Sequence, residues 1–216
     1  VDFVYITGDA YVDHPSFGPA VITRLLESRG YRIGIISQPD WKDKDSVTIY
    51  GEPRLAFLVS AGNMDSMVNH YSVSKKRRKS DAYTPGGVMG RRPDYATVVY
   101  GNLIRQTYKQ TPVILGGIEA SLRRLAHYDY WSDRLKRSGP SGFRSRYDFL
   151  WDGRTLDRRD CGSLDAGIAV SDITYISGTT VKTKSLDSVY DAVMLPSFEE
   201  LKRTAFLCQK FLHPVL

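Results

Sequence analysis

Three side chains with acid–base or metal-binding capacity occur within six residues near the start of the chain. Asp9, Asp13 and His14 lie in "GDAYVDHPSFG", residues 8–18, together with Tyr11. A carboxylate–imidazole set could bind a metal, transfer a proton or contact a cofactor. The spacing fits no tight metal-ligand pattern, so no metal site is assigned. The same residue types form ordinary turns and helix caps, and local turn chemistry is an equal alternative.

A second stretch with chemical potential is "GGIEASLRR". Gly116 and Gly117 stand where an apolar run gives way to a helical pattern, which permits close approach to the backbone, and helix N-termini attract anions. Arg123 and Arg124 could bind a phosphate or carboxylate, or pair with Glu119 or Asp133. Glu119 could also simply complement the helix dipole. Since no G-x-G-x-x-G pattern is present, this is a candidate anion site without a nucleotide fingerprint.

Five consecutive basic residues, Lys75 to Lys79, form the densest charge in a chain of net charge +6. A solvated loop is the simplest interpretation, and an anionic partner such as nucleic acid, phosphate or a membrane surface is the alternative. No recognition-helix pattern or stacking-aromatic motif accompanies the run, so the sequence does not favour nucleic acid. The aromatic residues at 127–131 continue a helical pattern, which favours packing over recognition.

Alternating strand and helix patterns predict the fold that positions these loops. The alternation is typical of a doubly wound, mainly parallel, Rossmann-like α/β sheet, in which ligands bind outside the carboxyl ends of the strands. The loops at 8–18, 60–66 and 116–124 should therefore meet at one edge. The predicted strands are 2–8, 31–39, 54–63 and 111–117, and the predicted helices are 19–30, 64–72, 92–110 and 119–133.

Composition sets the class of protein. With 216 residues and 42% hydrophobic content, the chain is expected to form one core. No apolar run reaches the length of a membrane span, and the first residues read as a strand and not as a signal peptide. Cys161 and Cys208 have no metal-ligand or redox spacing and suit a reducing compartment. We therefore predict a cytoplasmic protein with no membrane association.

Several long stretches, taken in order, resemble the N-terminal region of the YgiQ-type radical SAM proteins. The resemblance covers residues 1–138 and 165–202. It rests on "VDFVYITGDAYVDHPSFG", "SAGNMDSMVNHY", "KKRRKSDAYTPGG", "RRPDYATVVYGNLIR", "PVILGGIEASLRRLAHYDYWSD" and "SDITYISGTTVKTKSLDSVYDAVMLPSFEELK".

The resemblance implies an α/β N-terminal domain, similar to a cobalamin-binding domain, that packs on its own radical SAM barrel. In that barrel a C-x3-C-x2-C motif holds a [4Fe–4S] cluster that cleaves S-adenosylmethionine. This chain lacks the motif, so no cofactor is predicted in it and the domain is not expected to be catalytic alone. Asp13 and His14 are adjacent, unlike the D-x-H-x-x-G cobalamin pattern, so no cobalamin is predicted.

The resemblance also suggests roles for the candidate site residues, and two alternative functions remain. Asp9, Asp13, His14, Glu119 and the Arg123–Arg124 pair would line a substrate or cofactor cleft in the intact parent, with an anionic small molecule as a candidate ligand. One rival is a stand-alone anion- or nucleotide-binding module that uses the glycine turn and the arginine pair. The other is a basic nucleic-acid-binding protein that uses residues 75–79.

The stretch "RSGPSGFRSRYDFLWDGRTLDRRDCG", residues 137–162, has neither a strand nor a helix period. The family has a strand, a glycine-rich turn and a helix there, and codons of the present residues permit that sequence in a shifted frame. We therefore predict that the strand near 143–152 is disrupted, that 139–163 is irregular and that the sheet edge beside it is unprotected. The predicted divisions are a 1–138 domain, an out-of-frame 139–163 segment, a 164–202 continuation toward the barrel and an out-of-frame 203–216 tail.

Overall fold

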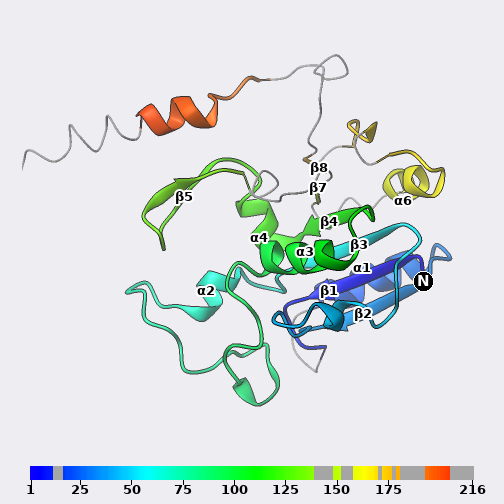
Figure 1. Ribbon diagram of the computed structural model, residues 1–216, viewed down its shortest axis with the longest axis horizontal. Coiled ribbons are helices and arrows are strands. Elements are labelled where there is room, and N and C mark those ends of the chain that lie inside the picture. Colours follow the sequence, from blue (N-terminus) through cyan, green and yellow to red (C-terminus); the bar gives the residue numbers. More distant parts are fainter. Residues whose placement is uncertain are drawn as a thin grey trace, which may run out of the picture.

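The computed structural model describes residues 1–11, 17–138, 148–151, 158–169, 172–176, 179–180 and 193–204. Its centre is a sheet with the strand order β2-β1-β3-β4-β7-β8, as predicted of mainly parallel type (Figure 1). The parallel strands are β1 (Phe3–Thr7), β2 (Ile33–Ser37), β3 (Ala56–Ser60), β4 (Val113–Gly116) and β7 (Asp148–Trp151), and β8 (Thr179–Thr180) is antiparallel.

Helices connect the strands and cover the sheet. They are α1 (Gly18–Glu27), α2 (Ser66–His70), α3 (Ala96–Thr107), α4 (Gly117–Leu122) and α6 (Arg158–Asp165), with short 3-10 turns η1 (Lys44–Val47) and η2 (Pro85–Gly87). A separate hairpin pairs β5 (His127–Asp129) with β6 (Arg134–Lys136). No helix in the described part of the chain is long and apolar enough to cross a bilayer.

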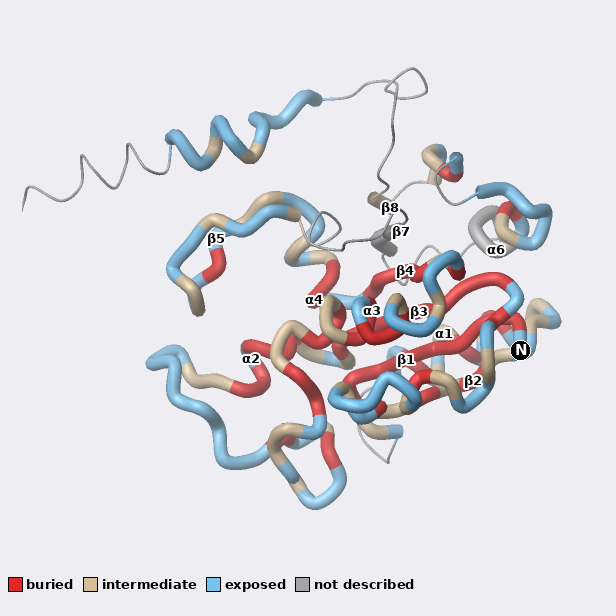
Figure 2. Tube along the Cα trace, in the orientation of Figure 1, coloured by how far each residue is buried: buried red, intermediate tan, exposed pale blue. Residues whose placement is uncertain are grey.

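β1, β3 and β4 are buried along their whole length because both faces of this part of the sheet are covered (Figure 2). Val4, Phe57 and Leu115 belong to the face that packs on α3 and η1. Phe3 and Leu58 belong to the opposite face, which packs on α1. This two-sided burial explains why the strands read as continuous apolar runs and not as alternating ones.

The order of the strands reverses between β1 and β3: the chain adds β2 on one side of β1, and then β3 and β4 on the other side. β1 pairs with β2 on one side and with β3 on the other, so the helix after β1 and the helices after β3 lie on opposite faces. The carboxyl ends of β1, β3 and β4 therefore flank a topological switch point, where doubly wound folds bind their ligands.

The helix predicted over residues 119–133 is wrong beyond Leu122, where α4 ends and the β5–β6 hairpin follows. The Asp129 carboxylate accepts hydrogen bonds from the Ser132 N–H and hydroxyl and from the Tyr95 hydroxyl. Side-chain-to-backbone bonds of this kind offer the chain a turn in place of a helix. Helix α3 also begins later than predicted, at Ala96, because Tyr95 has a φ of +52°.

The expectation that residues 139–163 are irregular is wrong for two segments. Asp148–Trp151 forms β7, which pairs in parallel with β4 and protects the edge predicted to be open, and Arg158–Asp165 forms α6. The edge of a sheet presents unpaired backbone N–H and C=O groups, which can pair with segments of many different sequences. Aromatic residues also favour strands. The remaining residues of this region, and the tail from 205 onward, lie outside the described part of the chain.

Candidate functional site

Arg92 is the centre of a buried charge cluster at the carboxyl ends of β1 and β3. Its side chain is fully enclosed, and Nη1 donates to Asp9 Oδ1 at 2.8 Å and to the Ala61 carbonyl oxygen at 2.9 Å. Its Nη2 donates to both carboxylate oxygens of Asp81, at 3.0 and 3.1 Å. Buried charges are tolerated when they are paired in this way. The cluster thus joins the loops after β1 and β3 to the segment that precedes α3.

Close backbone approach completes the environment of Asp9. The Asn63 N–H donates to Asp9 Oδ2 at 2.7 Å, so both carboxylate oxygens are engaged. Gly62 has a φ of +105°, and a Cβ at this position would lie 2.0 Å from Asp9 Oδ1. A glycine is therefore required where the β3–α2 loop crosses the carboxylate.

Glu119 is a second buried carboxylate, and it joins three helices. Its Oε2 accepts from the Ser66 N–H at 2.7 Å, and its Oε1 accepts from the N–H and hydroxyl of Thr97 at 2.9 and 2.7 Å. Ser66 and Thr97 lie in the first turns of α2 and α3, where backbone N–H groups lack helical partners and negative charge is favourable. Glu119 therefore occupies the place that an external anion would need.

Arg123 is held by the same region. Its Nη1 donates to Asp65, whose other carboxylate oxygen caps α2 through the Met67 N–H at 3.0 Å. Its guanidinium carbon lies 5.4 Å from the centre of the Tyr95 ring. Burial alone would lower the pKa of Arg123, but the hydrogen bond to Asp65 and the charge of Glu119 raise it. Arg123 is thus a fixed cation inside the protein.

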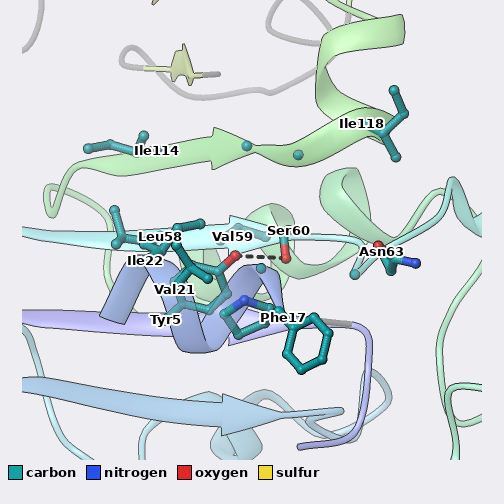
Figure 3. Close-up of a pocket in the computed structure, with 15 residues that line it drawn as sticks. Tyr5, Phe17, Val21, Ile22, Leu58, Val59, Ser60, Asn63, Ile114 and Ile118 are labelled. Atoms are coloured by element: carbon teal, nitrogen blue, oxygen red, sulfur yellow. Dashed lines mark hydrogen bonds between the residues drawn. The ribbon is translucent and has the colours of Figure 1, made fainter. Parts of the chain in front are cut away.

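A cleft of about 370 Å³ opens on the α1 face at the carboxyl ends of β1, β3 and β4 (Figure 3). Small-molecule sites in proteins occupy roughly 300–1,000 Å³, so the cleft is large enough for one. Its floor is formed by apolar side chains of the strands, and its rim carries exposed apolar side chains of α1 and α4. The floor includes Leu58 and Ile114, and the rim includes Phe17, Val21 and Ile118, which are 66%, 62% and 47% exposed.

The polar groups in this cleft are few and uncharged. Tyr5 donates to Ser60 Oγ at 3.2 Å, and burial raises the pKa of Tyr5 to about 12 although the Ser60 bond opposes the shift. Asn63 and the Gly116–Gly117 turn supply the other polar atoms, and Gly117 has a φ of +77° that favours glycine. The cleft fits an apolar or neutral group that accepts one or two hydrogen bonds.

The predicted site residues separate into four groups. Gly116 and Gly117 line the cleft, whereas Asp9, Glu119 and Arg123 reach the same strand edge but bond within the protein. Tyr11 and Arg124 are exposed and lie away from the cleft, and Asp13 and His14 lie outside the described residues.

Sequence reasoning missed the residues that shape the cleft and the charge cluster. Tyr5 and Ser60 are strand residues, and only the sheet register places their side chains on the α1 face together. Phe17 and Ile118 look like ordinary helix-end residues. Arg92 carried no sequence signal, since its partners Asp9 and Asp81 are distant along the chain.

The residues present do not fit a [4Fe–4S] cluster. The chain has two cysteines, and a C-x3-C-x2-C motif requires three. Among the described residues, no group of three or more His, Cys, Asp or Glu side chains is arranged to hold a metal ion.

Comparison with known proteins assigns the chain to a family. It is 50% identical over 215 residues to a UPF0313 protein of Clostridium perfringens, covering 97% of this chain and 32% of that protein. It is 46% identical over 201 residues to a UPF0313 protein of Clostridium botulinum and 49% identical over 198 residues to one of Methanocella arvoryzae. These matches cover 93% and 92% of this chain, and 31% and 33% of the relatives.

The chain therefore spans about a third of the length of these relatives. No solved structure matches it. The family described as Radical SAM N-terminal matches over residues 1–213. Together with the relatives, this match shows that the chain belongs to the Radical SAM N-terminal family.

Proposed function

We propose that this chain is the accessory N-terminal domain of a radical SAM enzyme, and that its cleft forms one wall of the cavity in which the catalytic part works. The cluster and S-adenosylmethionine would be bound by the remaining two-thirds of the protein. Three facts support this division of labour: the family assignment, the length of the relatives and the lack of a cysteine motif in this chain.

The observation that carries the proposal is the cleft at the switch point. Its rim exposes Phe17, Val21 and Ile118, three large apolar side chains at the edge where doubly wound folds bind ligands or partners. A neighbouring domain seated on this rim would bury it and enclose the Tyr5–Ser60 pair. These residues would then position an uncharged part of a substrate and exclude water from it.

A chimera tests this role. The matched third of the Clostridium perfringens relative is replaced by this chain, the cluster is reconstituted, and S-adenosylmethionine cleavage and proteolysis at the junction are measured. Val21→Trp would plug the rim, and we expect it to expose the junction to protease and to slow cleavage by about tenfold to a hundredfold. Ile49→Trp, at an exposed apolar position outside the cleft, is the matched control. Equal behaviour of the two variants would contradict the proposal.

The reading frame is a separate proposal. The origin of residues 139–163 and 203–216 in a shifted frame is supported by the family resemblance on either side of the first segment. Resequencing the coding DNA tests it. An unchanged reading of these codons in an intact gene would overturn it, whereas a single-base correction that restores the family pattern would support it.

A further inference from the structure

The basic run at residues 75–79 is built on a hydrogen-bonded turn and is not a free loop. The Ser72 N–H donates to the Lys76 carbonyl oxygen at 2.9 Å, and the Arg78 N–H donates to the His70 carbonyl oxygen at 2.7 Å. Tyr71 and Arg77 pair as an antiparallel bridge between these two bonds. We call residues 70–79 the basic hairpin. Its backbone bonds fix the direction in which the cationic side chains leave it.

The base of the basic hairpin is anchored in the protein interior. His70 is fully buried, and its Nδ1 lies 2.6 Å from Asp94 Oδ1. The Tyr71 hydroxyl donates to Asp94 Oδ2 at 2.7 Å. Because His70 also ends α2, the hairpin projects from a helix that is itself fixed by the buried Glu119.

The β5–β6 hairpin brings aromatic side chains to this surface, which the sequence did not reveal. The Tyr130 hydroxyl donates to the Val73 carbonyl oxygen at 2.6 Å, and the Trp131 ring lies 5.2 Å from the Tyr71 ring. Lys75 Nζ lies 4.8 Å from the centre of the Tyr130 ring. Two segments more than fifty residues apart thus form one surface, and Figure 2 shows both as largely exposed.

Most cations of this surface have no carboxylate partner among the described residues. Lys76, Arg78 and Lys79 are exposed and form no ion pair there, and Arg134 on the neighbouring hairpin is likewise exposed without one. The acidic residues close by are engaged with other side chains. Asp94 bonds to His70 and Tyr71, Asp129 bonds to Tyr95 and Ser132, and Asp133 bonds to Tyr128.

We propose that the basic hairpin and the β5–β6 hairpin form a binding surface for single-stranded nucleic acid. Cations that track phosphates, interleaved with exposed aromatic rings on which bases stack, are what such ligands require. Tyr128 and Tyr130 are 61% and 46% exposed and supply those rings. An acidic polypeptide would use the cations but has no flat bases to stack, so the aromatic component favours nucleic acid.

The test measures how tightly the full chain binds labelled single-stranded RNA and DNA at several salt concentrations. The oligonucleotides are about 12 nucleotides long, which is within the range that single binding sites cover. We expect log K to fall with log salt with a slope of about −3, and the triple variant Lys76→Gln, Arg78→Gln, Lys79→Gln to weaken binding at least about tenfold and flatten the slope by about 2. The control removes the same charge from exposed lysines elsewhere, and should change affinity less than about twofold. Its substitutions are Lys44→Gln, Lys109→Gln and Lys202→Gln.

A second pair of variants separates stacking from charge. Tyr130→Leu should weaken binding by about fivefold or more, whereas Tyr130→Phe, which keeps the ring and loses the bond to Val73, should bind nearly as wild type does. A preference for RNA or for DNA would identify the source of the ligand. Three results would each overturn the proposal. They are binding of polyglutamate as tight as that of the oligonucleotides, an equal loss of affinity in the hairpin triple variant and the control triple variant, and loss of oligonucleotide binding when this chain is part of the chimera with the Clostridium perfringens relative.

Discussion

The two sides of one strand edge differ in how their polar groups are used. On the α3 side, Arg92 and Glu119 are fully buried. The carboxylates of Asp9 and Asp81 are bonded to Arg92, and that of Glu119 is bonded to Thr97. On the α1 side, the cleft is apolar, partly exposed and contains the uncharged Tyr5–Ser60 pair. The charged residues at this edge thus fix the loops, and the uncharged residues are left free to bind.

The largest expected effect comes from removing the central cation of the α3 side. Arg92→Met would leave Asp9 and Asp81 buried without their partner, and we expect the free energy of unfolding to fall by about 3–5 kcal/mol. Urea denaturation followed by circular dichroism measures this. Arg91→Met, at the exposed neighbouring position, should cost less than about 0.5 kcal/mol. Similar losses in both variants would mean that the cluster does not carry the stability of this side.

A smaller loss is expected where shape is kept and charge is removed. Glu119→Gln places an amide NH₂ against the Ser66 or Thr97 donors, so at least one buried hydrogen bond is lost, at a cost of about 1–3 kcal/mol. Glu27→Gln removes a carboxylate from the exposed pair with Arg24 and should stay within about 0.5 kcal/mol. Thermal unfolding of both variants tests the contrast, which fails if Glu119→Gln is neutral.

The sequence predicts the features that depend on local signals and misses those that depend on contacts between distant residues. The first four strands along the chain and α1 were predicted correctly because apolar runs and their spacing are local signals. The helix through His127 was predicted wrongly because Asp129 bonds to Tyr95, which is distant along the chain. Long-range pairing of this kind leaves no periodic trace.

Whether a site residue is free to act depends on similar long-range contacts. Residue type marks Asp9, Glu119 and Arg123 as chemically capable, but whether a carboxylate is free depends on which donors the fold brings to it. Residue type gives no prominence to Tyr5 or Ser60, whose shared cleft depends on the pairing of β1 with β3. The glycine turn is a local signal, because Gly117 has a φ of +77° that favours glycine.

Acid should destabilise the α3 side selectively. Burial raises the pKa of Asp81, but the Tyr83 N–H and the charge of Arg92 outweigh it, so this pKa lies below its ordinary value of 3.8. A depressed folded-state pKa stabilises the protein above 3.8, and the contribution is lost as the pH falls below that value toward the folded pKa. Unfolding measured between about pH 6 and pH 2 should therefore show a steeper acid limb in the wild type than in Asp81→Asn. Parallel limbs would contradict this.

The smallest effect is expected on the α1 side, at alkaline pH. Burial raises the pKa of Tyr5 to about 12 from 10.0, so Tyr5 stabilises the folded state fully below 10 and progressively less as the pH rises toward 12. Tyr5→Phe removes one hydrogen bond to Ser60 and should cost about 1 kcal/mol at neutral pH while reducing the alkaline loss of stability. Unfolding of this variant between about pH 7 and pH 11 measures both. If its alkaline limb equals that of the wild type, Tyr5 is not the neutral, buried hydroxyl that the cleft requires, and the contrast between the two sides fails at this residue.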